Sequence, residues 1–331
     1  MLVTISDVAR EAGVSLSTAS RALNNSMLVS QEKKDRVAAA VKKLGYRPLR
    51  ISPARRSQQN KIIMVVTASL NAATLDAIRR TADSMGYQTA TTFVGETQED
   101  GYRSALELIR LLPAGLLCGI IFIHNECRDE GMWREFCQYP IVQIGEFRAM
   151  DPTVCVMIDD YSAAYDMTRF LIDRGYRRIA YVTSNDERQY SYCKLRKAGY
   201  EAALAAAGLP CEPALQMKAD YILEGGIDVA RQLAEQPVMP DAVFCSSDYM
   251  ALGCISELQK LGYSVPKDVA VCGFDNIDAT EYCLPRLTTI NQPYSEMGEE
   301  AVRMLDALIS GENTAGRKLI LPHAVLARDS T

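Results

Sequence analysis

The sequence predicts an α/β protein with a small three-helix N-terminal head and a body of two lobes, each a doubly wound parallel sheet. The chain has 331 residues, which is enough for two or three domains with separate cores. Residues 1–45 place apolar side chains at helical spacing. From residue 61 onward, short apolar runs alternate with helical stretches, which is typical of parallel strands covered by helices.

The composition excludes several classes of protein. Hydrophobic residues make up 48% and charged residues 23%, which excludes collagen-like, disordered and small disulfide-rich chains. No apolar run reaches the roughly 18 residues of a membrane helix, and the N-terminus lacks a signal peptide's apolar region. The ten cysteines form no CxxC pair and predict buried free thiols in a reducing compartment. We therefore expect a cytoplasmic protein without a membrane partner.

Charge is distributed unevenly along the chain. Residues 1–60 hold eleven basic and four acidic residues, a net charge of +7, whereas the remainder has a net charge of −12. A basic head can bind nucleic acid by releasing counterions from phosphates, and an acidic body rarely does. A solvated charged tail would explain the charge but not the helical periodicity of residues 1–45.

Three short helices are predicted in the head. Thr4 and Asp7 form a capping box at the start of the first helix, and Gly13 ends it. Ser15 caps a second helix over residues 16–23, and Ser30 caps a third over residues 31–44. The side chains expected to face inward are Ile5, Val8, Ala9, Ala12, Ala19, Ala22, Leu23, Val37, Ala40, Val41 and Leu44. Such a helix-turn-helix with a supporting helix lays its second helix into a DNA major groove.

Two series of strands and helices are predicted in the body. Strands are expected at residues 62–67, 87–94, 119–123, 141–144, 154–158, 178–183, 242–245 and 269–273. Helices are expected at residues 73–85, 98–112, 161–174, 195–207, 225–235 and 248–261. Ligands of doubly wound sheets bind on the loops beyond the carboxyl ends of the strands, so these loops should hold any small molecule.

Several segments resemble those of one known family. The runs TISDVAREAGVSLSTASRALNN and VSQEKKDRVAAAVKKLGYRP resemble the LacI/GalR family of bacterial transcription regulators. The segments FCSSDYMALG, VPKDVAVCGFDNID, RLTTINQP and LPHAVLARDST extend the resemblance over essentially the whole chain. FDNIDATEYC and IGEFR are most similar to the nucleoside-responsive (cytidine-repressor) branch.

The resemblance implies a periplasmic-binding-protein-like body whose chain crosses between lobes near residues 159–161, 289–292 and 321–323. The implied domains are a head at residues 1–46, a hinge at 47–60, an N-terminal lobe at 61–159 and 291–321, and a C-terminal lobe at 160–290 and 322–331. It further implies a homodimeric, ligand-responsive regulator, which we expect to be a repressor. Its implied partners are double-stranded operator DNA and a small-molecule effector.

The same resemblance assigns residues that contact DNA. Leu16, Ser17 and Arg21 occupy the base-facing positions of the second helix, where Arg21 can donate two hydrogen bonds to a guanine. The positions implied for phosphate contacts are Thr4, Thr18, Ser20, Asn24 and Ser30. For Ser20 and Asn24, local helix capping is the alternative.

Effector-binding positions follow in the same way. Asp275 resembles the family carboxylate that accepts hydrogen bonds from ligand hydroxyls. Arg196 resembles the family arginine that closes over the same ligand. The alternative is that the two residues form a salt bridge within the lobe. The other implied positions are Leu70, Asn71, Glu146, Phe147, Tyr190, Tyr192, Tyr221 and Ser247. The tyrosines could form an aromatic wall for a flat ring or a sugar face. A flat base between them, with Asn71 or Glu146 hydrogen-bonding its edge, would fit a nucleoside. This arrangement favours a nucleoside effector but leaves a sugar open. Many relatives carry an aromatic residue where this chain has Leu70, so stacking on a ligand is not expected at that position.

The hinge departs from the family pattern. Relatives insert a leucine into the minor groove at this point, whereas the equivalent position here is Arg55, followed by Arg56. Pro53 would break a helix interior, so the segment is expected either to start its helix there or to stay extended. Arg55 and Arg56 are therefore expected to bring charge near DNA in place of an apolar wedge.

No motif of the body indicates catalysis, a cofactor or a metal site. Nucleotide-binding glycine motifs are missing, and two histidines do not suffice for a convincing Ser/His/Asp set. The pair Asp159 and Asp160 predicts helix capping rather than a metal site, and Gly225 and Gly226 predict a turn at a helix start. The competing class is a solute-binding or sugar-processing protein with an accessory head.

Overall fold

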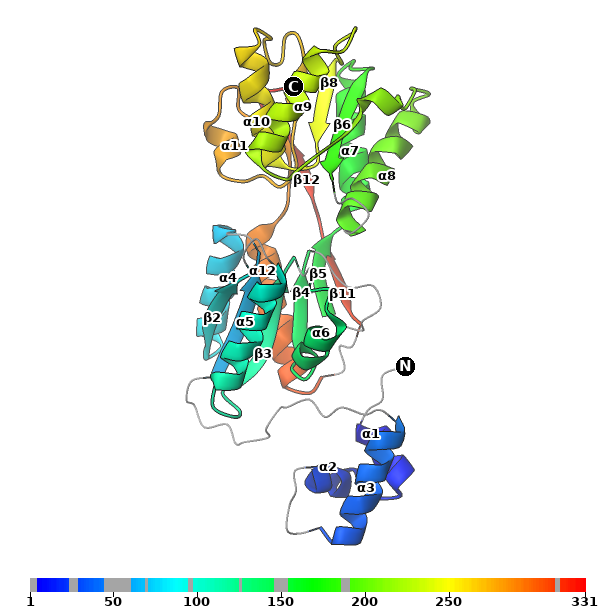
Figure 1. The fold of residues 1–331 in the computed structure, drawn as a ribbon, viewed down its shortest axis with the longest axis vertical. Coiled ribbons are helices and arrows are strands. Elements are labelled where there is room, and N and C mark those ends of the chain that lie inside the picture. The colour runs from blue at the N-terminus through cyan, green and yellow to red at the C-terminus, as the bar shows by residue number, and fades with distance from the viewer. Residues whose placement is uncertain are drawn as a thin grey trace. The chain divides into compact units, whose positions relative to one another are not determined.

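The computed structural model describes residues 5–23, 29–44, 61–68, 71–94, 98–124, 127–145, 154–185, 191–312 and 316–331 (Figure 1). The chain divides into two compact units, of which the first comprises Met1–Cys155 with Gly298–Lys318 and the second comprises Val156–Met297 with Leu319–Thr331. The chain therefore passes between units after residues 155, 297 and 318, whereas the family resemblance implies crossings near 159–161, 289–292 and 321–323.

The head consists of the three predicted helices, α1 (Ile5–Ala12), α2 (Leu16–Leu23) and α3 (Gln31–Leu44). Ser15 caps α2, because its Oγ accepts a hydrogen bond from the Thr18 amide at 3.2 Å. Gly13 ends α1 with a positive φ of 61°, a backbone conformation that glycine adopts without strain. The expected cap at Thr4 lies outside the described residues.

The head is held together by small apolar side chains. Its buried residues are Val8, Ala9, Ala12, Ala19, Val37 and Ala40, with Val14, Ala22, Leu23, Val41 and Leu44 packed against them. Alanines at these contacts let the helices approach closely. Arg36 of α3 donates to the Ala12 carbonyl at 2.6 Å and so satisfies an oxygen at the end of α1.

A six-stranded sheet has the strand order β11-β5-β4-β3-β1-β2. Its strands are β1 (Lys61–Thr67), β2 (Tyr87–Phe93), β3 (Leu117–Ile123), β4 (Ile141–Ile144), β5 (Val154–Ile158) and β11 (Lys318–Leu321). Helices α5 (Gln98–Leu111) and α6 (Glu130–Phe136) cover the face that carries Ile120 and Phe122. The other helices beside this sheet are α4 (Ala72–Ser84) and α12 (Tyr294–Ile309), and α12 places Leu305 against Gly119 on the opposite face.

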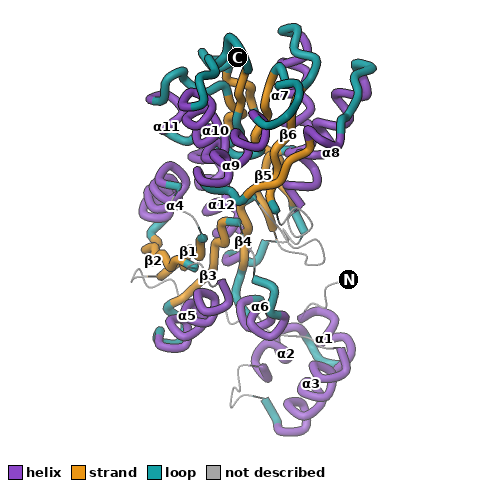
Figure 2. The backbone as a smooth tube through the Cα atoms, turned by 45° about the horizontal axis from the view of Figure 1, so that its top comes forward, coloured by secondary structure: helices purple, strands orange, loops and turns teal. Residues whose placement is uncertain are grey.

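The second unit is built on a four-stranded parallel sheet with the strand order β7-β6-β8-β9. Its strands are β6 (Ile179–Ser184), β7 (Gln216–Ala219), β8 (Ala242–Cys245) and β9 (Ala270–Cys272). One face packs on α7 (Asp160–Asp173) and α8 (Ser191–Ala206), the other on α9 (Leu223–Ala234) and α10 (Asp248–Lys260). Figure 2 shows the strands enclosed between these helices. This confirms the predicted α/β class.

Some elements were not predicted. They are the helices α6, α12 and α11 (Ala279–Tyr282), the strands β7 and β11, and the antiparallel pair β10 (Thr289–Asn291) and β12 (Ala324–Leu326). The strands β10 and β12 have three residues each, too few to show a hydrophobic period. By contrast, α12 has a readable pattern, since Met297, Ala301, Val302 and Leu305 are all buried.

The glycine pair lies at a helix start, as predicted. Gly225 and Gly226 belong to the first turn of α9. A Cβ atom on Gly226 would come within 1.9 Å of the Met250 carbonyl oxygen of α10. The glycine therefore allows the backbones of α9 and α10 to approach closely.

Candidate functional site

Polar side chains of the second unit gather where its parallel strands end. The segments that leave the carboxyl ends of β7, β8 and β9 contain Tyr221, Ser246 and Asp275, and α8 follows β6 in the chain. Carboxyl ends of parallel strands share one edge of a sheet, which is the usual ligand-binding edge of doubly wound folds.

Arg196 of α8 is the centre of this cluster. Its side chain is only 6% exposed. Its Nε donates to Asp160 Oδ1 at 2.7 Å and its Nη1 to the Ser246 carbonyl at 2.7 Å. The guanidinium also lies 3.5 Å from the ring centroid of Phe274. A buried cation needs such partners, because an unpaired charge in this position would be strongly destabilising.

Asp275 faces Arg196 from the loop after β9. Its Oδ1 accepts a hydrogen bond from Gln292 at 2.7 Å and lies 3.8 Å from Arg196 Nη1. Burial raises the pKa of Asp275 to about 6, although Arg196, Gln292 and Tyr294 each lower it. The side chain remains 20% exposed, so solvent or a ligand can reach it. Asp275 and Arg196 therefore meet within the second unit, which both the predicted ligand clamp and its alternative, a salt bridge within the lobe, require.

The two aspartates at the start of α7 have different roles. Asp159 caps the helix as predicted, because its Oδ1 accepts from the Ser162 amide at 3.0 Å. The prediction is wrong for Asp160, the buried first residue of α7, which forms the ion pair with Arg196. Sequence reasoning missed this role because the partners lie 36 residues apart.

An aromatic pair lies beside the ion pair. The rings of Tyr192 and Tyr221 stack with centroids 6.1 Å apart and planes at 20°, and the Arg196 guanidinium lies 5.0 Å from the Tyr192 centroid. Tyr221 Oη shares a hydrogen bond with Ser246 Oγ at 2.9 Å, which fixes the ring. The third expected tyrosine, Tyr190, lies outside the described residues.

Other residues were missed although most lie in the segments that carry the resemblance. These are Ser246 in FCSSDYMALG, Phe274 in VCGFDNID, Gln292 in RLTTINQP, and Tyr294 directly after it. Burial and partners of this kind depend on tertiary packing, which a single sequence does not display.

The remaining effector positions have separate environments. Ser247 is buried and precedes α10 without a side-chain cap bond. Asn71 caps α4 in the first unit, since its Oδ1 accepts from the Thr74 amide at 3.0 Å. Leu70, Glu146 and Phe147 lie outside the described residues.

The exposed face of α2 carries the residues assigned to base readout. Arg21 and Ser17 are exposed, and Leu16 is 51% exposed despite being apolar. Ser15 Oγ lies 3.0 Å from Ser17 Oγ and 2.8 Å from Thr18 Oγ1, so these hydroxyls already have local partners. Ser30 is exposed before α3, and the Ser20 side chain is not described. The positions Thr4, Asn24, Arg55 and Arg56 lie outside the described residues.

Metal and membrane sites are not indicated by the part of the chain that the structure describes. Within it, no group of three or more His, Cys, Asp or Glu side chains could hold a metal ion. All ten cysteines are free thiols, six of them buried. None of the described helices is both long and apolar enough to cross a membrane.

Comparisons with known proteins agree with this architecture. Residues 4–48 match the family model of bacterial regulatory proteins of the lacI family, and residues 168–331 match that of the periplasmic binding protein-like domain. The chain is 31% identical over 333 residues to the HTH-type transcriptional repressor CytR of Escherichia coli (strain K12), covering 99% of this chain and 96% of that protein. It is 30% identical over 332 residues to catabolite control protein A of Priestia megaterium, with all of both chains covered.

Among solved structures, the transcriptional regulator CelR–cellobiose complex is similar, with a TM-score of 0.74 and 28% identity over 99% of this chain and 100% of that chain. A helix-turn-helix head on a periplasmic-binding-protein-like body defines a DNA-binding transcriptional repressor with an effector-binding domain. The chain belongs to the lacI family of bacterial regulatory proteins, which confirms the resemblance found in its sequence.

Proposed function

We propose that this repressor acts in the cytoplasm as a homodimer and that the polar cluster of its second unit binds a small hydroxylated effector, with a nucleoside favoured over a sugar. The observation that carries the proposal is the 3.8 Å separation of Asp275 Oδ1 and Arg196 Nη1. This distance is longer than a hydrogen bond, so a ligand hydroxyl could satisfy both groups.

The chemistry of the pair suits a vicinal diol. An ionised carboxylate accepts hydrogen bonds from two hydroxyls, while a guanidinium donates to the oxygens of the same hydroxyls. Asp160 and the Ser246 carbonyl hold Arg196 in place, and Gln292 holds Asp275. Because these partners fix the two charged groups beforehand, little side-chain entropy would be lost on binding.

A nucleoside is favoured by the aromatic pair beside the clamp. Tyr192 and Tyr221 stack on each other, and a flat base would extend this stack, whereas free ribose would rely mainly on the clamp. The alternative is a sugar effector, which the cellobiose complex of the similar regulator supports. A solute-binding protein with an accessory head is less well supported, because the relatives are transcriptional regulators.

Operator recognition is assigned to the exposed face of α2. Arg21 would read a guanine in the major groove, Ser17 would bond a base edge, and Leu16 would contact a thymine methyl group. The proposed phosphate contacts are Thr4, Thr18, Ser20, Asn24 and Ser30. Helix-turn-helix heads read half-sites as dimers, and in the second unit Tyr282 and Leu284 expose apolar surface that a second copy could cover.

Effector affinity should depend on pH through Asp275. Since burial raises its pKa to about 6, acidification through that value protonates the carboxylate and weakens an acceptor of ligand hydroxyls. Affinity should fall by up to about tenfold per pH unit below the pKa, because one proton must be released on binding. For the same group the raised folded-state pKa favours folding at acid pH, and this contribution is lost as pH rises through the pKa. Calorimetric titration across this range measures the first effect, and Asp275→Asn should abolish it.

The hinge arginines should contribute charge to DNA binding. Replacing both Arg55 and Arg56 with alanine should flatten the slope of log operator affinity against log salt, by up to about 0.9 per lost phosphate contact. Fluorescence anisotropy at several salt concentrations measures the slope. Lys43→Ala is the control. Because Lys43 already pairs with Glu11 at 2.6 Å, its removal should leave the slope near that of wild type. A slope equal to that of wild type would show that the hinge arginines do not reach DNA.

Calorimetry with a ligand panel tests the effector proposal directly. The panel contains adenosine, cytidine and uridine, free ribose, and the disaccharide cellobiose. Binding of one nucleoside with ribose much weaker is the expected result. Preference for cellobiose or ribose would replace the nucleoside with a sugar, and the absence of any diol-dependent binding would contradict the clamp.

A further inference from the structure

The loop that carries Asp275 has an unusual backbone. Asp275 and the following Asn276 both have positive φ angles, 120° and 58°. Such conformations are costly for residues other than glycine and persist only where neighbouring groups hold them. The Asp275 amide donates to the Ile290 carbonyl at 3.0 Å, and the Ile277 amide donates to Asp248 Oδ2 at 2.9 Å.

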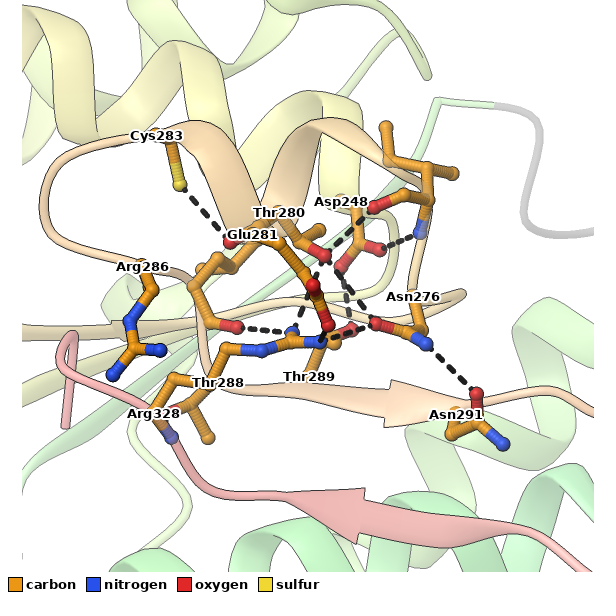
Figure 3. A network of polar contacts seen from close by, with 12 residues as sticks. Asp248, Asn276, Thr280, Glu281, Cys283, Arg286, Thr288, Thr289, Asn291 and Arg328 are labelled. Atoms are coloured by element: carbon orange, nitrogen blue, oxygen red, sulfur yellow. Dashed lines mark hydrogen bonds and ion pairs between the residues drawn. The ribbon is translucent and has the colours of Figure 1, made fainter.

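Between these two backbone anchors, the Asn276 side chain is held at both ends (Figure 3). Its Oδ1 accepts a hydrogen bond from Arg328 Nη2 at 2.8 Å. Its Nδ2 donates to Asn291 Oδ1, also at 2.8 Å. The amide side chain therefore links the loop to β10 on one side and to the segment after β12 on the other.

Arg328 is itself a fixed donor. Its side chain is 9% exposed, and Nη1 donates to the Leu287 carbonyl at 2.8 Å and to Thr280 Oγ1 at 3.2 Å. Nη2 also lies 3.0 Å from Glu281 Oε1, which balances the buried charge. Four bonds from one planar group hold its orientation, so Arg328 presents Asn276 with a rigid anchor.

We propose that Arg328 is a positioning residue for effector binding: it holds Asn276 in the left-handed conformation and thereby aims the preceding carboxylate at Arg196. Arg328 acts through Asn276 and not on the ligand. The inference rests on the proposed effector site, and it adds a residue from a different part of the chain to that site. Groups that orient a ligand's direct partners commonly change affinity by about 10- to 100-fold in metal sites.

Effector titration of the full chain tests this role. Arg328→Ala should bind the nucleoside that wild type prefers about tenfold more weakly, as an outer positioning group would. Arg286→Ala is the matched control. Arg286 is exposed and pairs at 2.7 Å with Asp329, the residue that directly follows Arg328. Its affinity should equal that of wild type. Should Arg328→Ala fail to fold, Arg328→Lys keeps the charge and should give a smaller loss in the same direction.

A double-mutant cycle separates positioning from general destabilisation. If Arg328 acts through the carboxylate, Arg328→Ala should cost little further affinity in an Asp275→Asn background. A merely structural role would give losses that add. Additive losses, or a single variant that binds as tightly as wild type, would overturn the inference.

Hydrogen exchange provides a readout that needs no effector. In ligand-free protein, Arg328→Ala should speed exchange of the Asp275 and Ile277 amides, while Arg286→Ala should leave it unchanged. Unchanged exchange at both amides would overturn the inference even if affinity fell. Wild type that binds none of adenosine, cytidine and uridine would instead contradict the nucleoside proposal, and exchange would still test the anchor.

Discussion

Replacing Asp275 with asparagine should weaken effector binding by about tenfold to hundredfold, which corresponds to the roughly 1.5–3 kcal/mol of a charge-assisted hydrogen bond. Asparagine keeps the shape of the side chain and, like aspartate, belongs to the residues that most often adopt a positive φ, here 120°. It removes the charge that faces Arg196 and turns one acceptor into an NH2 donor that points at ligand hydroxyls. Isothermal titration calorimetry measures the loss.

The head should not sense this substitution. Operator affinity without effector is expected to stay within a few-fold of wild type, because Asp275 lies in the second unit and the head belongs to the first. The 2′,3′-dideoxy form of the preferred nucleoside should fail against wild type for the same reason as the variant. If Asp275→Asn responds to effector at wild-type concentrations, the carboxylate is structural and the diol clamp is wrong.

Arg21→Ala should cost about 1–3 kcal/mol in operator affinity, the value of one good bidentate contact to a guanine. Arg21 is the one long donor on the exposed side of α2, where Leu16 and Ser17 offer only apolar and short polar contacts. Non-specific affinity should change much less, because phosphate contacts supply most of it. Competition binding with operator and random-sequence DNA measures both affinities.

Lys43→Ala removes one positive charge from α3 and is the control here; because Lys43 pairs with Glu11, operator and random-DNA affinity should both stay near wild type. An equal loss on both DNAs for Arg21→Ala would identify Arg21 as a phosphate contact. In that case, sequence readout would depend on other residues of the head.

Local signals explain which elements the sequence predicted well. The bounds of α2 and α3 agree with prediction because Ser15 and Ser30 mark their starts, and Gly13 fixes the turn between α1 and α2. The strands β4, β5 and β8 agree because each is a short, fully buried run, apolar throughout except for Gln143 in β4. Caps and buried runs are properties of a few neighbouring residues, so a single sequence displays them.

Long-range pairing explains what was missed. Asp160 and Arg196 lie 36 residues apart, and Arg328 lies 52 residues from the Asn276 that it holds. Nothing in the local pattern distinguishes a buried Asp160 from the capping Asp159 beside it. The resemblance pointed to Asp275 and Arg196, but only the folded chain reveals the groups that orient them.

Titrating the full-length protein onto its operator with and without effector tests the central claim most directly. The operator is first selected from genomic fragments by mobility shift, and the preferred nucleoside is then added at increasing concentration. Specific binding of two chains per operator, with an affinity that changes at effector concentrations near the calorimetric dissociation constant, is the predicted result. Binding without sequence preference at any salt concentration, or operator affinity that no ligand of the panel alters, would contradict a ligand-responsive repressor.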